Sequence, residues 1–330
     1  MRNRRTFITC IAVGLLTLPL ATKAQQAGRI YRLGVLAPGT RSTSTTGLIQ
    51  RLAADMRELG YTEGQNLLLE SRFGEDKPDL FPGLARELVQ LKPDAIVVIG
   101  TLGLEASKNA TTTVPLIFLS NVDPVAAGIV TSLSRPGGNV TGVLIAPEGT
   151  LAEKKLDLLK QLVPRATRIA VLLPDDPGVG MKLQIKEAQK AAVSLGIELV
   201  IVEVRGGDYK KAFGAIAARQ CAALLVGAHS RFLRDRNMII ELAATHRLPA
   251  IYEWPQQVKD GGLMSYGAND TDTYRQVAVY VDRIFKGALP GELPIQQPSK
   301  LELVINLKTA KALGLTIPQP LLLRADEVIE

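Results

Sequence analysis

Short runs of apolar, β-branched residues alternate along the chain with longer stretches in which apolar residues recur at helical spacing. The run Asp94 to Ile99 (DAIVVI) is almost entirely apolar, which is typical of a strand buried on both faces of a parallel sheet. The same pattern predicts strands over 30–37, 67–72, 94–99, 115–119 and 140–144, and helices over 46–59, 80–91, 102–110 and 125–133. Such alternation predicts a parallel sheet with helices on both faces.

The alternation starts again after a predicted helix over 148–163, which ends at Pro164. Further strands are predicted over 168–173, 198–204, 222–226, 249–252 and 263–266, and helices over 181–195, 208–219, 231–245 and 271–286. We therefore expect an α/β protein with two Rossmann-like, parallel-sheet lobes joined around residues 146–167. The lobes are assigned as 25–147 (lobe 1, with part of 262–286) and 148–261 (lobe 2), and the C-terminal segment 287–330 stays without a lobe.

The N-terminal residues have the layout of a bacterial secretory signal peptide. Arginines at positions 2, 4 and 5 precede an apolar stretch over 8–20, and Thr22-Lys23-Ala24 places small residues before a cut at Gln25. The stretch is shorter than the ~20 apolar residues that span a bilayer, so residues 1–24 are expected to be removed and the protein to be periplasmic. Paired arginines also resemble a twin-arginine export signal but occur in ordinary leaders, so the export route stays open.

Composition and charge bear on nucleic-acid binding, on disulfides and on the number of lobes. The chain carries +7, but four basic residues and no acidic one lie in the leader, so the mature chain carries only +3. No Lys/Arg block follows the leader, which leaves nucleic-acid binding without support. Cys221 is the only cysteine after the cut, so no intramolecular disulfide forms. About 300 mature residues are more than one core usually covers, which again favours two lobes.

The sequence also lacks the motifs of the commonest cofactor sites and catalytic centres. The turn after the first strand (Leu36-Ala37-Pro38-Gly39-Thr40) has no three-glycine dinucleotide fingerprint, and no Walker phosphate loop occurs. No Ser stands in a Gly-x-Ser-x-Gly frame, and no His, Cys, Asp and Glu cluster has metal-ligand spacing. We therefore predict no cofactor, no metal site, no catalytic residue and no enzymatic activity.

Several motifs, in this order, resemble one family over nearly the whole mature chain. They are Gly60-Tyr61-Thr62-Glu63-Gly64-Gln65-Asn66, Asp123-Pro124-Val125, Ser134-Arg135-Pro136-Gly137-Gly138-Asn139-Val140-Thr141-Gly142, Pro249-Ala250-Ile251-Tyr252-Glu253, Gly261-Gly262-Leu263-Met264-Ser265-Tyr266-Gly267 and Leu303-Val304-Ile305-Asn306-Leu307-Lys308-Thr309-Ala310-Lys311. The chain resembles substrate-binding proteins of ABC importers, in the subfamily that includes tryptophan- and tyrosine-binding members. The resemblance implies a type I periplasmic-binding fold, with a hinge of several strands and a ligand cleft between the lobes.

Ligands of open parallel sheets bind beyond the carboxyl ends of the strands, so the residues there are the candidates in lobe 1. Backbone N–H groups at Gly100 and Thr101, where a helix opens, favour a ligand carboxylate, although Thr101 is equally well explained as a helix cap. Asp123 would accept a hydrogen bond from a ligand ammonium group, or cap a helix that starts at Pro124. The lobe 1 candidates are Thr40, Ser42, Gly100, Thr101, Ser120, Asn121 and Asp123.

In lobe 2, the aromatic residues Tyr252 and Trp254 alternate with Glu253 at the end of a predicted strand. An aromatic ligand would stack on the rings of Tyr252 and Trp254, and the alternative is that these rings pack within the lobe. Glu253 would pair with a ligand ammonium group, and the alternative is a solvated carboxylate. Tyr266 lies between small residues at a predicted crossover between the lobes, where a plain turn is the alternative. Tyr252, Glu253, Trp254 and Tyr266 complete the candidate ligand residues.

Two function classes remain open at this point. The first is a periplasmic protein that binds a small molecule, with an amino acid as first choice and aromatic ones included, and delivers it to the permease and ATPase subunits of an ABC importer. The second is a periplasmic sensor module or enzyme on the same two-lobed fold. Export and the absence of catalytic motifs favour the first.

Overall fold

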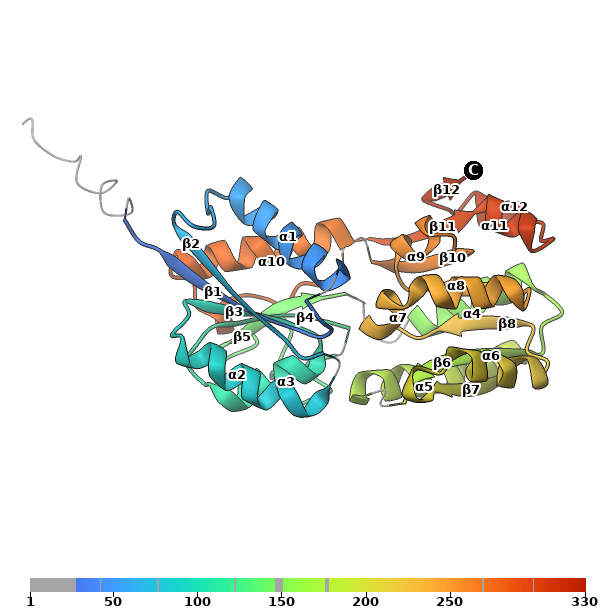
Figure 1. Ribbon diagram of the computed structural model, residues 1–330, viewed down its shortest axis with the longest axis horizontal. Helices are drawn as coiled ribbons and strands as arrows, with labels where there is room; N and C mark the ends of the chain where they lie inside the picture. The colour runs from blue at the N-terminus through green and yellow to red at the C-terminus, as the bar shows by residue number, and fades with distance from the viewer. Residues whose placement is uncertain are drawn as a thin grey trace, which may run out of the picture.

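The computed structural model describes residues 28–330 except 42, 76, 122, 146–150, 176–177, 269 and 299, so the predicted leader lies outside the described residues. Two lobes lie side by side, each built on one sheet (Figure 1). Lobe 1 has the strand order β2-β1-β3-β4-β5, and lobe 2 has the order β12-β11-β10-β9-β8-β6-β7. Every pair is parallel except β10 with β11, so the predicted pair of parallel-sheet lobes is confirmed.

Lobe 1 contains the first half of the chain and one helix from much later in the sequence. Its elements are β1 (Tyr31–Ala37), α1 (Thr43–Glu58), β2 (Leu67–Phe73), α2 (Phe81–Gln90), β3 (Ala95–Ile99), α3 (Thr101–Ala110), β4 (Leu116–Ser120), β5 (Val140–Leu144) and α10 (Asp270–Phe285). Along β1, Leu33 and Val35 pack in one hydrophobic cluster with α1 and α10, whereas Leu36 packs in another with α2 and α3. The alternation of side chains along a strand thus fills both faces of the sheet.

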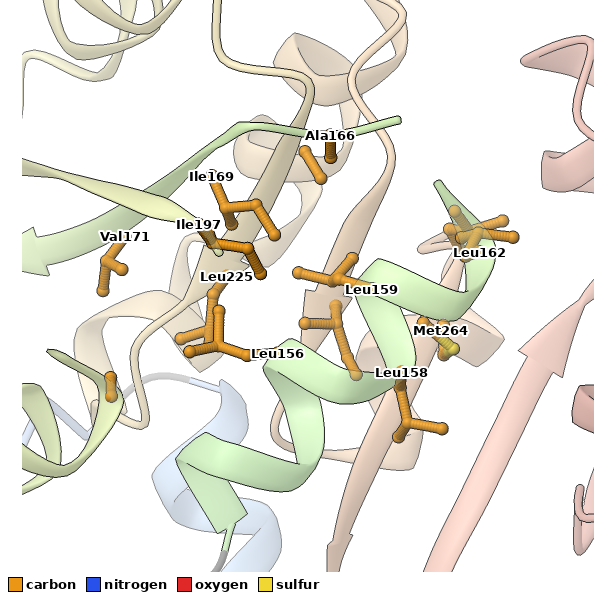
Figure 2. Close-up of a cluster of buried hydrophobic side chains, with 14 of the residues drawn as sticks. Leu156, Leu158, Leu159, Leu162, Ala166, Ile169, Val171, Ile197, Leu225 and Met264 are labelled. Atoms are coloured by element: carbon orange, nitrogen blue, oxygen red, sulfur yellow. The ribbon is translucent and has the colours of Figure 1, made fainter. Parts of the chain in front are cut away.

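Lobe 2 contains the remaining elements. They are α4 (Leu151–Leu162), β6 (Arg168–Pro174), α5 (Gly178–Leu195), β7 (Glu198–Val204), α6 (Tyr209–Ala218), β8 (Ala223–Val226), α7 (Ser230–Arg234), α8 (Arg236–Thr245), β9 (Ala250–Tyr252), α9 (Pro255–Lys259), β10 (Met264–Ala268), β11 (Leu301–Asn306), α11 (Leu307–Ala312), α12 (Gln319–Leu322) and β12 (Glu327–Ile329). Figure 2 shows one core face, where Leu156 and Leu159 of α4 pack among Ile169, Val171 and Leu225 of the sheet.

The chain passes between the lobes at more than one place. It leaves lobe 1 between β5 and α4, returns between β10 and α10, and leaves again before β11. The segment that precedes β11 still belongs to lobe 1, because Leu144 N donates to Gln296 O at 2.8 Å. The C-terminal segment 287–330, which the sequence left without a lobe, is therefore divided between the two.

Two predicted helices differ from the structure. The segment 125–133 forms turns, because Gly128 adopts φ +67° and the N–H groups of Ile129 and Val130 both donate to Pro124 O. The predicted helix 231–245 is split into α7 and α8 at Asp235, whose carboxylate accepts from the hydroxyl of Tyr209 and the guanidinium of Arg234.

Candidate ligand-binding site

The carboxyl ends of the strands in the two lobes face each other. Asn121, directly after β4, donates from Nδ2 to the carbonyl oxygen of Ala228, the second residue after β8, at 3.5 Å. We call these two facing sets of strand ends the lobe boundary. In lobe 1 the strand order reverses between β1 and β3, and in lobe 2 it reverses between β6 and β8. Open α/β sheets bind ligands outside the carboxyl ends of strands at such switch points.

Gly100 and Thr101 lie at the lobe 1 switch point, where α3 begins. Gly100 adopts φ +85° as the residue before α3, and its N–H donates to Leu119 O at 2.8 Å, so that N–H is already satisfied. Thr101 is the first residue inside α3 rather than its cap, and its hydroxyl lies 3.2 Å from the hydroxyl of Ser120. Of the two predicted N–H groups, that of Gly100 is therefore occupied. The N–H groups left for a ligand carboxylate are those of the first turn of α3, which begins at Thr101.

The other lobe 1 candidates are spread over the boundary. Ser120 ends β4 and is buried, and Asn121 bridges to lobe 2 as described. Asp123 accepts the N–H of Val125 at 2.8 Å, so its carboxylate closes a local turn, while the predicted helix after it is absent. Thr40 is partly buried after β1, and Ser42 lies outside the described residues.

Tyr252 and Glu253 are occupied within lobe 2. Tyr252 is 1% exposed, in a hydrophobic cluster with Phe213 and Phe232, and this burial raises the pKa of its hydroxyl. Glu253, 4% exposed, forms an ion pair with Lys155 of α4, also 4% exposed. In this structure the Tyr252 ring has no accessible face and the Glu253 charge is already paired, so the contact of either residue with a ligand stays a prediction.

Trp254 and Tyr266 lie in different surroundings. Trp254 follows β9 at the lobe boundary, is partly buried, and belongs to none of the four hydrophobic clusters formed by the described residues. Its position is fixed by α9, since its N–H donates to the side chain of Gln257 at 3.2 Å. Tyr266 lies within β10, two residues before the strand ends, and packs against the lobe 2 core. It therefore precedes the crossover from lobe 2 to lobe 1, where the sequence predicts it.

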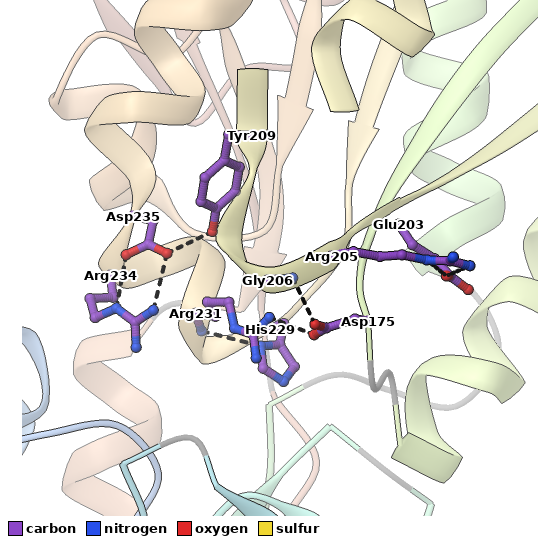
Figure 3. Close-up of polar contacts among 9 residues, drawn as sticks. All are labelled: Asp175, Glu203, Arg205, Gly206, Tyr209, His229, Arg231, Arg234 and Asp235. Carbon is purple, nitrogen blue, oxygen red and sulfur yellow. Dashed lines mark hydrogen bonds and ion pairs between the residues drawn. The ribbon is translucent and has the colours of Figure 1, made fainter. Parts of the chain in front are cut away.

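Sequence reasoning missed two charged residues at the lobe 2 switch point. Asp175 directly follows β6, and Arg231 in α7 follows β8; Nη1 of Arg231 donates to Oδ1 of Asp175 at 2.7 Å (Figure 3). The backbone N–H of Gly206, after β7, donates to Oδ2 of the same carboxylate at 3.0 Å. Hydrogen bonds from Gly206 and Arg231 lower the pKa of Asp175, so the carboxylate is ionised at neutral pH.

The signal for these residues was present but ambiguous. Pro174 and Pro177 flank the pair Asp175-Asp176, which is typical of a solvated turn, and Arg231 lies beyond the residues that directly follow a strand. Among the described residues, no three His, Cys, Asp or Glu side chains are grouped as metal ligands require. Within the same part of the chain, no helix is long and apolar enough to cross a membrane.

Comparison with known proteins agrees with the two-lobed fold. The family model described as ABC transporter substrate binding protein matches residues 40–329. A tyrosine-binding protein of Clostridioides difficile (strain R20291) is 25% identical over 261 residues, which cover 79% of this chain and 74% of the relative.

Two solved structures match 91% of this chain and the whole of their own chains, each with a TM-score of 0.81. One is a conserved domain protein of Vibrio cholerae O1 biovar El Tor, at 28% identity. The other is an ABC domain of Streptococcus pneumonia in complex with L-Trp, at 25% identity. The two-lobed α/β arrangement is that of type I periplasmic-binding proteins, and the chain belongs to the ABC transporter substrate-binding protein family.

Proposed function

We propose that this protein binds an aromatic amino acid between its lobes, on the outer side of the cytoplasmic membrane, and delivers it to the permease of an ABC importer. The observation that carries the proposal is the position of Trp254, at the carboxyl end of β9 and outside the hydrophobic clusters of the described residues. An indole ring at a strand end of the lobe boundary offers a flat apolar surface to a second ring.

The relatives support the same class of ligand. A relative at 25% identity is a tyrosine-binding protein, and a structure with a TM-score of 0.81 holds L-Trp. Family members act outside the cytoplasm, which agrees with the predicted leader; its cleavage before Gln25 stays a prediction, because residues 1–27 lie outside the described residues.

Isothermal titration of the exported protein with L-tryptophan, L-tyrosine, L-phenylalanine and L-leucine tests the proposal. We expect one bound ligand per chain and about twofold to tenfold tighter binding of the best aromatic amino acid than of leucine, because a stacked ring pair adds about 0.5–1.5 kcal/mol beyond its buried area. Trp254→Ala is expected to weaken that binding about tenfold or more, and Trp254→Phe less.

The ligand-free melting temperature separates this role from packing within the lobe. If Trp254 were a core residue, its truncation to Ala would cost about 3–5 kcal/mol of stability and leave affinity unchanged in the folded fraction. Equal binding of all four amino acids, or recovery of a chemically altered ligand by mass spectrometry, would argue against the proposed function.

We further expect the lobes to approach each other when the ligand binds. The chain connects them at several crossings, and a ligand that contacts both lobes stabilises the closed arrangement by its higher affinity for it. Small-angle X-ray scattering should therefore show a smaller radius of gyration in the presence of saturating ligand than in its absence. An unchanged radius would indicate that binding requires no movement of the lobes.

A further inference from the structure

We propose that Asp175 and Arg231 together bind the two charged groups of an α-amino acid, with the Arg231 guanidinium on the carboxylate and the Asp175 carboxylate on the ammonium group. This inference rests on the proposed function, which it deepens by assigning the charged part of the ligand to two named side chains.

The two residues lie at the lobe 2 switch point. Asp175 follows β6 and Arg231 follows β8, and the lobe 2 strand order reverses between these two strands. Ligands of open α/β sheets bind at this kind of place. The hydrogen bond from Asn121 to Ala228, three residues before Arg231, brings lobe 1 to the same strand end. The pair therefore lies where a ligand enclosed by both lobes would contact lobe 2.

The pair retains hydrogen-bonding capacity for a ligand. Among the described residues the guanidinium of Arg231 uses Nη1 on Asp175, and its Nε and Nη2 donate to no partner. A guanidinium has five N–H donors, and a carboxylate accepts about four hydrogen bonds, of which Asp175 has two from Arg231 and Gly206. The Arg231 side chain is 18% exposed, so most of it is covered and a part remains accessible.

The pair is also held in place before any ligand arrives. The N–H of Arg231 donates to Nδ1 of His229 at 3.2 Å, and the next residue, Phe232, is fully buried in the lobe 2 core. The Gly206 N–H donates to Oδ2 of Asp175, the carboxylate oxygen that Arg231 does not contact (Figure 3). A preorganised pair loses little side-chain entropy on binding, and a bidentate guanidinium–carboxylate contact is among the strongest hydrogen-bonded contacts in proteins.

The pair also matches the charge of the ligand. An α-amino acid at neutral pH carries one positive and one negative group on adjacent atoms, and an Arg–Asp pair presents the opposite charges side by side. Binding then neutralises all four charges in one cluster without leaving a net charge at the boundary. The alternative site for the carboxylate is the N-terminus of α3, where the N–H of Gly100 is already bound to Leu119 O.

The test compares ligands that lack one charged group with variants that lack its partner. The full-length exported protein is titrated with L-tryptophan, tryptamine (no carboxylate) and indole-3-propionate (no ammonium), and with the matching tyrosine, tyramine and 3-(4-hydroxyphenyl)propionate series. Arg231→Gln is expected to weaken amino-acid binding about tenfold to a hundredfold and to leave the amine within about twofold. Asp175→Asn is expected to weaken binding of the amino acid and of the amine, but not of the acid.

Control variants separate recognition from folding. Arg168→Gln removes a similar ion pair, with Glu198, at the opposite ends of β6 and β7, and should leave all affinities unchanged. Arg231→Lys retains the positive charge but loses the planar, two-pronged set of donors of the guanidinium, so we expect an intermediate loss of amino-acid affinity. This variant replaces Arg231→Gln in the comparison if Arg231→Gln does not fold.

The outcomes distinguish the pair from the proposed function. Equal weakening of all three compounds by Arg231→Gln, or unchanged amino-acid binding by that variant, overturns the assignment of the pair and leaves the proposed function in place. Failure of the wild-type protein to bind tryptophan and tyrosine overturns the proposed function, and the pair with it.

Discussion

Replacement of Lys155 by Met is expected to lower the free energy of unfolding by about 3–5 kcal/mol. Lys155 and Glu253 are each 4% exposed and form an ion pair between α4 and the end of β9. Removal of the ammonium group leaves the Glu253 carboxylate buried without a counter-charge, and the desolvation of that charge is the source of the loss. Chemical denaturation followed by circular dichroism measures the effect.

The neighbouring residue provides the control. Lys154 pairs with Asp157 on the same helix, but both side chains are about one-third exposed, so Lys154→Met should cost no more than about 0.5 kcal/mol. The double variant Lys155→Met/Glu253→Leu removes both charges and should recover most of the stability, because an apolar pair of similar volume replaces a buried ion pair without loss. A Lys155→Met protein as stable as the Lys154→Met protein would show that the pair is not buried in solution.

Lys155 also shows what the sequence could reveal and what it could not. Leu151, Lys155, Leu159 and Leu162 recur at helical spacing and all are buried, so a lysine stands within the apolar stripe of α4. That spacing alone would have predicted a buried charge that needs a partner. The identity of that partner could not be read from the sequence, because Glu253 lies 98 residues away from Lys155 and contacts α4 only in the folded lobe.

The lobes themselves could be predicted because their signals are local. Each central strand is a continuous apolar run, and each long helix has one apolar face, so periodicity is sufficient to place them. The predicted helix over 125–133 was wrong. Its apolar residues Ile129 and Val130 are buried, but they lie in a turn that includes Gly128, and an apolar pattern that reflects burial does not distinguish a turn from a helix. Tyr252 and Trp254 likewise share a pattern, but only Tyr252 packs in the core.

The Asp175–Arg231 pair could not be recognised from the sequence for a different reason. Its importance depends on β6 and β8 being adjacent strands at a switch point, and the order of strands in a sheet does not follow from their order in the chain. The two residues lie 56 positions apart and are joined only after β8 inserts beside β6.

Gly142→Ala is expected to destabilise lobe 1 by about 3 kcal/mol, at the upper end of the usual cost of overpacking. Gly142 lies in β5 opposite Phe118 of β4, and a Cβ atom there would lie 2.4 Å from the Phe118 carbonyl oxygen and 2.6 Å from its ring. The ring is fully buried in the lobe 1 core, and the oxygen belongs to a strand whose position the sheet fixes, so neither can move without disturbing its neighbours.

Gly214→Ala supplies the matched control, because Gly214 lies in α6 and an added Cβ meets no atom within 4 Å. Alanine is favoured over glycine within a helix by about 0.5–1 kcal/mol, so this variant should be more stable than the wild type. The two Gly→Ala changes should therefore shift the denaturation midpoint in opposite directions.

If Gly142→Ala had no effect, β4 and β5 would be less closely packed than the structure shows, and no steric conflict would require a glycine at position 142. If Gly142→Ala/Phe118→Leu recovered part of the loss, the ring would be the main obstacle, whereas no recovery would assign the cost to the Phe118 carbonyl oxygen.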